Sequence, residues 1–348
     1  MLKADFTSHT LIFNNPSGTS RGVLNTKPSW FLRVWNENNP NIYGIGECSP
    51  IKGLSIDPID AIDKKLTQIC NNINNIDSID IDQFPCIKFG IETAFKDLKN
   101  GGRKIIFNNS FSRSQSKIKI NGLIWMDNKE AMLNSIRIKI ENGYNCLKLK
   151  IGAIDFSDEL SLLAFIRKEF NSSELEIRVD ANGAFIKENA LLKLNSLAKF
   201  DIHSIEQPIK PKQFSTMNKL CNESPIPIAL DEELIGIINN QSQENLLDTI
   251  NPKYIVLKPS LLGGLDSTKS WIKLAEKRKI KWWVTSALES NIGLNSIAQF
   301  TAEFSNKLPQ GLGTGQIYKN NIPSFLELNA DELYINNELE WDLSNLKF

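Results

Sequence analysis

The sequence predicts an α/β fold in which a closed (β/α) barrel of the TIM type follows a smaller α+β domain. Three observations indicate this. Apolar runs of strand length alternate with helical patterns from residue 117 onward. Charged side chains close five successive apolar runs at nearly constant spacing, and the first hundred residues show a different, β-rich pattern. Strands that alternate with helices at such a period are typical of parallel βαβ units.

The barrel elements follow from the hydrophobic pattern. Apolar runs that predict strands lie at 117–126, 146–151, 175–180, 202–206, 226–231, 254–258, 281–286 and, as a short one, around 308–313. Helical patterns lie between them at 128–142, 157–170, 187–199, 211–221, 242–249, 264–279 and 291–304. A doubly wound open sheet is the alternative fold. It would not bring residues from five consecutive strands to one place, so the barrel is favoured.

The first hundred residues predict a separate α+β layer. The β-rich runs 10–14, 29–35 and 43–47 are typical of an antiparallel meander, and helical patterns follow at 58–73 and 85–99. We expect the segments 15–28 and 46–53 to be loops that close over the barrel mouth. The expected division is therefore a cap at 1–105, the barrel at 106–317 and a final segment, 318–348, that returns to the cap.

Composition excludes several classes of partner. The chain has 348 residues, of which 41 % are hydrophobic, so it can bury a substantial core. Forty basic residues balance forty acidic ones, which gives no reason to expect nucleic acid or an anionic membrane as a partner. No apolar run approaches the roughly 20 residues of a membrane span, and the first residues lack a signal-peptide core. The five cysteines show no CxxC spacing, so we expect reduced thiols in a cytoplasmic protein.

Five charged residues are the strongest functional signal. They are Lys150, Asp180, Glu206, Asp231 and Lys258, each at the end of an apolar run, and the steps between them are 30, 26, 25 and 27 residues. Each step accommodates one strand, one helix and two loops. Parallel strands with this period bring the five side chains to the same end of the sheet. Three carboxylates between two lysine positions then predict a metal site flanked by candidate bases.

The histidine content indicates which metal to expect. The chain contains two histidines, His9 and His203, which are too few for an imidazole-rich zinc site. Carboxylate oxygens must therefore hold the ion, and such ligands favour Mg²⁺, with Mn²⁺ as a second possibility. We expect His203 to be a core or supporting residue. Because histidines are so few, lysines or carboxylates must carry out any proton transfer near neutral pH.

Strand alternation adds two residues to this group. Side chains two positions apart share a face of a strand, so Lys148 lies on the face of Lys150 and Arg178 on that of Asp180. Arg178 has the planar fork that binds a substrate carboxylate, and it has an equally good alternative as an inter-strand pair with an acid of the barrel. Glu232 follows Asp231 and is expected to point to the other face in a structural role.

These motifs resemble those of the enolase superfamily, muconate-lactonising-enzyme-like subgroup. The matching segments are Lys148-Leu-Lys150, Val179-Asp-Ala-Asn-Gly183, Glu206-Gln-Pro208, Asp231-Glu232 and Lys258-Pro259. The resemblance covers nearly the whole chain. It implies an α+β cap, a modified (β/α)7β barrel and a C-terminal segment that completes the cap.

The resemblance also implies roles. Asp180, Glu206 and Asp231 would hold Mg²⁺, which binds the carboxylate of a small-molecule substrate and stabilises the charge formed when an adjacent proton is removed. Lys150 would be the general base. Lys148, the metal and partial burial are expected to lower the pKa of Lys150 towards the roughly 7–8 that suits a catalytic lysine. Lys258 would stay charged and stabilise the intermediate, or act as a second acid/base in a racemase.

Further residues are assigned by position and resemblance. Ser286, Gly311 and Gly313 lie where substrate oxygens would meet backbone amides, and Asn182 is expected to support the metal site from outside its ligand set. The tryptophans, among them Trp125 and Trp283, are expected to be packing residues.

Three hypotheses about the function remain open at this point. The segments Leu257–Gly264, Thr285–Ser290 and Gly311–Gly315 look most like a superfamily member that dehydrates a cyclohexadiene carboxylate to an aromatic acid in menaquinone biosynthesis. N-acylamino acid racemases and dipeptide epimerases share the same charged residues. The epimerases carry a second Lys-x-Lys on the sixth strand, where position 256 here is Val. A non-catalytic barrel is disfavoured because every acid and both lysine positions are present, and the oligomeric state is not fixed by the sequence.

Overall fold

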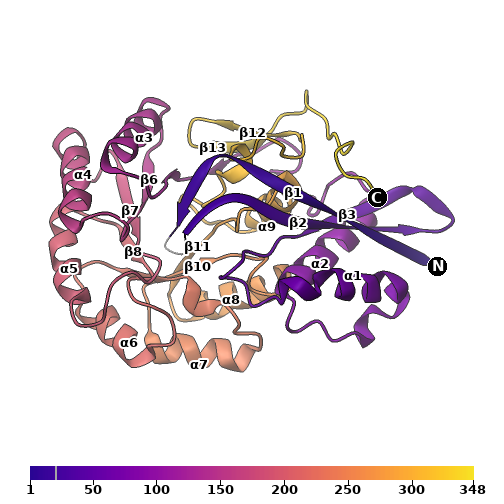
Figure 1. Cartoon of the computed structure of the whole chain (residues 1–348), viewed down its shortest axis with the longest axis horizontal. Helices are drawn as coiled ribbons and strands as arrows, with labels where there is room; N and C mark the ends of the chain where they lie inside the picture. Colours follow the sequence, from indigo (N-terminus) through magenta and orange to yellow (C-terminus); the bar gives the residue numbers. More distant parts are fainter. Residues whose placement is uncertain (20–21) are drawn as a thin grey trace.

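The structure is a computed structural model that describes residues 1–19 and 22–348. Its centre is a seven-stranded parallel sheet with the strand order β11-β10-β9-β8-β7-β6-β5 among the described residues (Figure 1). The strands are β5 (Gly122–Ile124), β6 (Cys146–Lys150), β7 (Glu176–Asp180), β8 (Ser204–Glu206), β9 (Ile228–Leu230), β10 (Tyr254–Leu257) and β11 (Lys281–Val284). One helix follows each strand, as the sequence predicts: α3 (Lys129–Glu141), α4 (Phe156–Glu169), α5 (Ala190–Leu197), α6 (Phe214–Glu223), α7 (Asn240–Ile250), α8 (Leu265–Lys277) and α9 (Asn291–Thr301).

The residues around position 310 close the sheet into a barrel. Gln310 pairs in parallel with Ile120, and Gly311 pairs in parallel with Thr285 at the end of β11. The Gly311 N–H donates to the Val284 carbonyl at 2.8 Å, and the Gln310 N–H donates to Lys119 at 2.8 Å. This is the short eighth strand predicted around 308–313. A 3-10 turn follows it, at Thr314–Gln316, so the fold is a modified (β/α)7β barrel.

The strand register brings the charged residues together. Lys150 lies opposite Asp180, and Asp180 lies opposite Glu206 on the next strand. Lys148 lies opposite Arg178 one layer lower. Because all these strands are parallel, their C-terminal residues collect at one end of the barrel.

The cap is built from one antiparallel sheet and two main helices. The strands β1 (Leu2–Thr19), β2 (Gly22–Asn36) and β3 (Asn39–Cys48) pair in that order. Behind them lie α1 (Ile62–Asn71) and α2 (Pro85–Lys99), with 3-10 turns η1 (Ile59–Ala61) and η2 (Ile73–Ser78). Their apolar faces form a core of their own, which includes Leu32, Leu66 and Ile87. The structure thus contains the predicted α+β cap.

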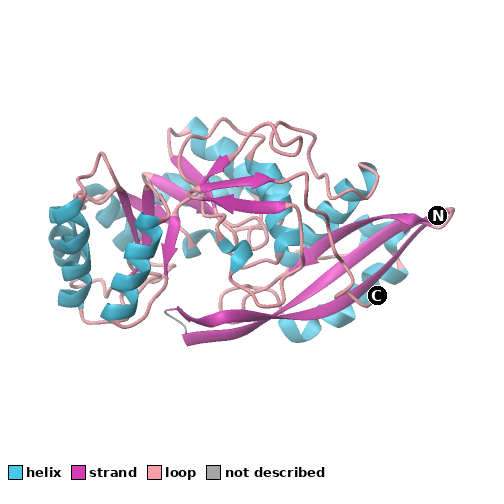
Figure 2. Cartoon of the chain, turned by 90° about the horizontal axis from the view of Figure 1, so that it is seen from above, coloured by secondary structure: helices cyan, strands magenta, loops and turns pink. Residues whose placement is uncertain are grey.

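The expected loop at 15–28 is mostly a β ribbon, which corrects the sequence interpretation. Ser17 pairs with Leu24 and Thr19 with Gly22, so β1 and β2 continue almost to the tip. Residues 20 and 21 of the expected loop lie outside the described residues. The backbone pairing between the two strands outweighs the turn-like composition of this segment. Figure 1 shows the ribbon crossing from the cap towards the barrel strands, and Figure 2 shows it along one side of the barrel.

The last residues return to the cap. Tyr318 pairs with Phe13 of β1, and Leu346 packs with Phe31 and Ile45. Between these contacts, the hairpin β12 (Leu326–Asn329) and β13 (Glu332–Ile335) extends a small sheet with β4 (Ile118–Lys119) at the start of the barrel. The C-terminal segment therefore completes the cap. Across the described residues, no helix has the length and apolar character needed to cross a membrane.

Two cap carboxylates join the cap to the barrel by binding the free amides of barrel helices. Glu47 of β3 accepts hydrogen bonds from the Ser290 N–H at 2.9 Å and the Gly293 N–H at 3.0 Å, at the start of α9. Glu92 of α2 accepts from the N–H groups of Leu265 and Asp266, at the start of α8. The first amides of a helix have no partner within the helix and attract negative charge. Each acid therefore fixes one barrel helix to the cap.

We predict that Glu92→Gln makes the protein more stable at alkaline pH. Burial and the nearby charge of Asp266 raise the pKa of Glu92 to about 7. The folded protein thus holds this proton more tightly than the unfolded chain does. The resulting stability is complete below pH ~4.5 and is lost as the pH rises through about 7. Glutamine keeps an acceptor for the helix amides without the buried charge.

Urea unfolding at pH 5 and pH 8 measures this difference. We compare the free energy of unfolding of Glu92→Gln with that of the wild type at each pH. The difference, variant minus wild type, should be larger at pH 8 than at pH 5 by on the order of 2 kcal/mol. The exposed Glu338→Gln is the control and should show no such gain. An equal loss of stability for Glu92→Gln at both pH values would contradict the assignment.

Candidate active site

A cavity of about 500 Å³ opens at the C-terminal end of the barrel strands. Its walls include the side chains of Lys148, Lys150 and Lys258 from the barrel, while Leu24 of β2 and Ile51 come from the cap. The ribbon and the segment after β3 thus cover the barrel mouth as the sequence predicts, although the ribbon is a strand pair. Cavities of this size hold small organic molecules.

An ammonium–carboxylate network forms the inner wall of this cavity. The Lys148 Nζ lies 2.9 Å from Asp180 Oδ2 and 2.5 Å from Glu206 Oε2. The Lys150 Nζ lies 2.8 Å from Asp180 Oδ2, and Lys258 pairs closely with Asp231. The three carboxylate side chains are at most 2 % exposed, whereas those of the lysines retain 9 to 13 %. The acids therefore lie beneath the lysines, which face the cavity.

Burial and charge act in opposite directions on these groups. Burial lowers the pKa of Lys148, but the charges of Asp180, Glu206 and Asp231 outweigh it and raise that pKa well above its usual value. Burial and the neighbouring Asp180 raise the pKa of Glu206 strongly. Lys148 and Lys150 together hold the pKa of Asp180 below its usual value despite its burial. Glu206 is consequently the acid of the three whose charged form is least favoured in the absence of a further cation.

The three acids fit a divalent cation by their chemistry. All their donor atoms are oxygens, which suits Mg²⁺ or Mn²⁺. Within residues 1–19 and 22–348, no group of three ligating side chains is already arranged around a common point. The lysine ammoniums bind the carboxylates instead. Glu206 Oε1 is buried and has no hydrogen-bond partner among the described residues, so it is an acceptor in need of a cation or donor.

Asn182 links Lys150 to Glu232. The Lys150 Nζ donates to Asn182 Oδ1 at 2.7 Å, and Asn182 Nδ2 donates to Glu232 Oε1 at 3.0 Å. Asn182 adopts a left-handed backbone conformation with φ of 43°, which asparagine tolerates better than most residues. Glu232 lines the cavity, contrary to the expectation that it points to the other face. The strand ends at Leu230, and a 3-10 turn from Glu232 to Leu234 changes the side-chain direction.

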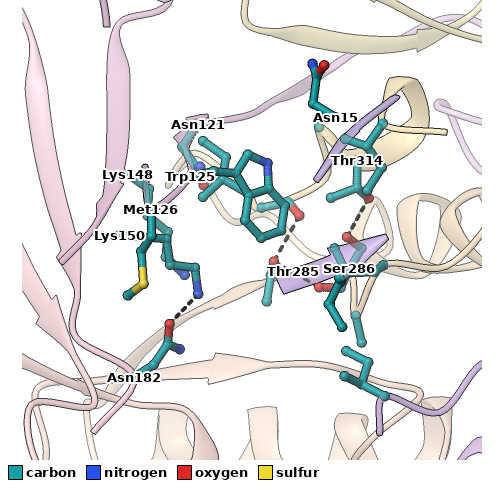
Figure 3. Close-up of a pocket in the computed structure, with 18 of the residues that line it drawn as sticks. Asn15, Asn121, Trp125, Met126, Lys148, Lys150, Asn182, Thr285, Ser286 and Thr314 are labelled. Atoms are coloured by element: carbon teal, nitrogen blue, oxygen red, sulfur yellow. Dashed lines mark hydrogen bonds between the residues drawn. The ribbon is translucent and has the colours of Figure 1, made fainter. Parts of the chain in front are cut away.

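The wall opposite Lys148 and Lys150 is polar and comes from the ends of the last two strands (Figure 3). Ser286, Gly311 and Gly313 line the cavity, as predicted from their position. Thr285 and Thr314 also line it, and Ser286 Oγ lies 2.6 Å from Thr314 Oγ1. The two threonines were missed by the sequence interpretation, although both lie within the segments that carry the resemblance.

Trp125 is a second residue that the sequence interpretation placed elsewhere. It follows β5 and lines the cavity, rather than acting as a core residue alone. Figure 3 shows its indole between the Lys148–Lys150 side and the Thr285–Ser286 side. A flat apolar ring between charged and polar walls suits a planar, anionic substrate.

Arg178 does not line the cavity, which corrects its expected role as a substrate ligand. Its side chain is 1 % exposed and donates from Nε to Glu176 Oε1 at 2.7 Å and from Nη1 to the Pro309 carbonyl at 2.8 Å. Its guanidinium lies 4.4 Å from the centre of the Trp283 ring. The acid two residues earlier on the same strand face therefore binds Arg178 within the barrel. The alternative expected from the sequence was an acid on another strand, whereas Glu176 belongs to β7 itself.

Lysines are the commonest charged residues of the cavity wall. Among the described residues that line it are five lysines and two acids. Three of these lysines are paired with the buried acids Asp180, Glu206 and Asp231, so their charges are balanced from beneath. The other two, Lys52 and Lys139, lie outside the network described above.

The comparison with known families agrees with this geometry. Residues 131–332 match the family model described as Enolase C-terminal domain-like, which covers more than half of the chain. The chain therefore belongs to the enolase superfamily. The match begins within α3 and ends within the C-terminal segment, and it contains every charged residue of the network.

Three of the similar proteins indicate the class of enzyme. The chain is 46 % identical to an o-succinylbenzoate synthase of Desulfotalea psychrophila over 92 % of this chain and 95 % of that protein. A crystal structure of MenC from Desulfotalea psychrophila LSv54 has a TM-score of 0.86 and 41 % identity, covering 96 % of this chain and 99 % of that one. An L-amino acid-D/L-Glu epimerase of Sulfurimonas denitrificans is 26 % identical over 76 % of this chain and 79 % of that protein. The chain is thus an enzyme similar to o-succinylbenzoate synthase.

We predict that Gly311→Ala disrupts the polar wall. A Cβ at this position would lie 2.3 Å from Thr285 Oγ1 and 2.6 Å from Thr285 Cβ, so the pairing that closes the barrel must shift. Overpacking of this kind costs about 1–3 kcal/mol. At Gly313 the closest atom to a new Cβ is the end of the Ile120 side chain, at 3.2 Å, so Gly313→Ala is the matched control. Urea unfolding should separate the two variants, and equal stabilities would contradict the predicted contact.

Proposed function

We propose that this protein is a Mg²⁺-dependent lyase that forms 2-succinylbenzoate by eliminating water from a hydroxylated cyclohexadiene carboxylate, in menaquinone biosynthesis. The arrangement that carries the proposal is the buried lysine–carboxylate network on one wall of a cavity of suitable size. The similarity to an o-succinylbenzoate synthase over nearly the whole chain supports this member of the superfamily.

Asp180, Glu206 and Asp231 would hold the metal. When bound, Mg²⁺ supplies Lewis-acid stabilisation of the substrate carboxylate and of the negative charge that develops on it. Glu206, with its unpartnered Oε1, is already in need of a cation. Lys148 binds both Asp180 and Glu206, so it orients two of the three ligands.

Lys150 would transfer the proton. In its neutral form, Lys150 Nζ accepts the proton from the carbon next to the substrate carboxylate, and the C–H electron pair becomes part of the aromatic ring as the C–O bond breaks. The resulting ammonium returns the proton to the departing hydroxide, which leaves as water. Asp180 and Asn182 fix Nζ by hydrogen bonds of 2.8 and 2.7 Å, so the same group serves both steps without moving far.

Lys258 would act as a fixed positive charge. It pairs with Asp231, and although burial lowers the pKa of Lys258, the charges of Asp231 and Glu232 outweigh it and raise that pKa. Lys258 therefore stays protonated and stabilises the negative intermediate from its side of the cavity. Ser286 and the backbone at Gly311 and Gly313 would bind the other substrate oxygens.

Racemisation or epimerisation on the same scaffold is the second candidate. Two lysines, Lys150 and Lys258, line one cavity, and removal and return of a proton on opposite faces of a carbon needs two such groups. The similarity to an L-amino acid-D/L-Glu epimerase supports keeping this candidate. The 46 % identity to an o-succinylbenzoate synthase, against 26 % to this epimerase, favours the lyase.

We place this activity in the cytoplasm. All five cysteines are free thiols, which agrees with a reducing compartment. The substrate would be a small carboxylate, and we propose no nucleic-acid or membrane partner.

A side-by-side assay tests the proposal. One arm follows aromatisation of the cyclohexadiene carboxylate by ultraviolet absorbance, and the other follows α-proton exchange of N-succinyl amino acids in D₂O. With Mg²⁺ present, the wild type should aromatise its substrate, and a chelator should stop the reaction until Mg²⁺ is restored. Proton exchange without aromatisation would replace the lyase by the second candidate.

The variant Lys150→Ala should lose activity in both arms by at least about 10³-fold, since it removes the base. The matched control is Lys139→Ala, which removes a cavity lysine outside the network and should keep kcat within about threefold. Substantial activity in Lys150→Ala would show that another group takes the proton.

A further inference from the structure

We propose that Lys27 is a positioning residue that holds the cap segments over the cavity. Lys27 lies on β2, three residues after Leu24, which lines the cavity. Its own side chain does not line the cavity and is 3 % exposed. A buried ammonium at this place needs a reason, because burial of an unpaired charge is strongly unfavourable.

The contacts of Lys27 lead to the segment after β3. Its Nζ donates to the Ser49 hydroxyl and lies 3.3 Å from the Ser49 carbonyl oxygen. The Ser49 hydroxyl also lies 2.9 Å from that of Ser29, on β2. Ser49 is followed by Ile51, Lys52 and Leu54, which form part of the cavity wall. Lys27 therefore ties this wall segment to the ribbon.

Two buried acids lie in the surroundings of Lys27. Burial lowers the pKa of Lys27, and the charges of Glu47 and Glu289 offset part of this effect. Glu289 is fully buried; it accepts hydrogen bonds from the Ser260 hydroxyl and, at 2.7 Å, from the Ala287 N–H. Glu47 is the acid that binds the start of α9. Glu289 thus belongs to the barrel side of the interface, and Glu47 and Lys27 belong to the cap side.

Glu289 connects this cluster to the catalytic residues. Its partner Ser260 lies two residues after Lys258, and Ala287 is next to Ser286 in the polar wall. Lys27, Glu47 and Glu289 are therefore buried between three segments that line the cavity: the ribbon, residues 49–55 and residues 285–290. Removal of Lys27 breaks its contacts with Ser49 and takes away a positive charge that acts on two buried carboxylates, so these three segments have to separate or admit water.

The consequence for catalysis is a defect in substrate binding. Lys150 and its partners lie on the opposite wall and keep their contacts when Lys27 is replaced. The cap wall, in contrast, loses its attachment. We expect Lys27→Met to raise KM at least about tenfold and to change kcat by less than about threefold, since the chemical groups stay in place.

The kinetic readout rests on the proposed function, so a second readout that is independent of activity accompanies it. Amide hydrogen exchange in residues 49–55 and 285–290 should become faster in Lys27→Met than in the wild type. The control is Lys3→Met, which removes an exposed cap lysine on β1 and should change neither readout. Lys27→Met/Glu289→Gln removes one buried carboxylate together with the cation and should recover part of the lost affinity. Lys27→Arg keeps the charge and should lie between wild type and Lys27→Met.

The outcomes separate the two proposals. If the wild type aromatises the substrate and Lys27→Met has unchanged KM and unchanged exchange in both segments, the positioning role is wrong. If Lys27→Met does not fold, the same comparison is made with the double variant and with Lys27→Arg; wild-type KM and exchange in both would overturn the proposal. If the wild type lacks the activity, the lyase assignment fails, and the exchange measurement alone decides the role of Lys27.

Discussion

The organisation of this protein depends on the pairing of buried lysines with buried acids at the barrel mouth. Lys148, Lys150 and Lys258 each contact an acid that is almost completely buried. Breaking one such pair by removing a partner costs about 3–5 kcal/mol. The pairs hold together only if the strands keep their parallel register, because the acids and lysines come from different strands. The site and the fold are therefore specified by the same contacts.

Buried charged groups also join the cap to the barrel. Glu47 and Glu92 reach from the cap to the starts of α9 and α8, where helix amides lack partners. The C-terminal segment adds apolar contacts to the cap sheet. The cap is thus anchored through charged and polar contacts at defined points. Lys27 adds a cation to one of these points, and through it the cap wall of the cavity is tied to the polar wall of the barrel.

Much of the fold and the site could be predicted from the sequence, because the relevant signals are local. A charge that ends an apolar run marks the end of a strand, and the constant spacing of five such charges specifies the parallel barrel. The register of Lys150, Asp180 and Glu206 agrees with this prediction. The catalytic and metal-binding roles of these residues stay proposals, since the structure shows their positions and contacts but no reaction.

Other features depend on contacts that a local pattern does not contain. Alternation places Arg178 on the interior face but does not say whether its long side chain runs up to the cavity or down to Glu176. Glu232 follows a strand end, where a helical turn replaces the alternation. The segment 15–28 has the composition of a loop, yet pairing between β1 and β2 makes it a ribbon. The outcome is decided by a side-chain conformation at Arg178, by a change in backbone geometry at Glu232 and by strand pairing in the segment 15–28.

Anomalous diffraction from crystals soaked in Mn²⁺ tests the central claim most directly. We expect one Mn²⁺ at the barrel mouth, bound by carboxylate oxygens of Asp180, Glu206 and Asp231. The ammonium groups of Lys148 and Lys258 should then lie farther from the oxygens that bind the ion. A saturating soak that leaves the three acids paired only with their lysines, or places the ion elsewhere, would contradict the account.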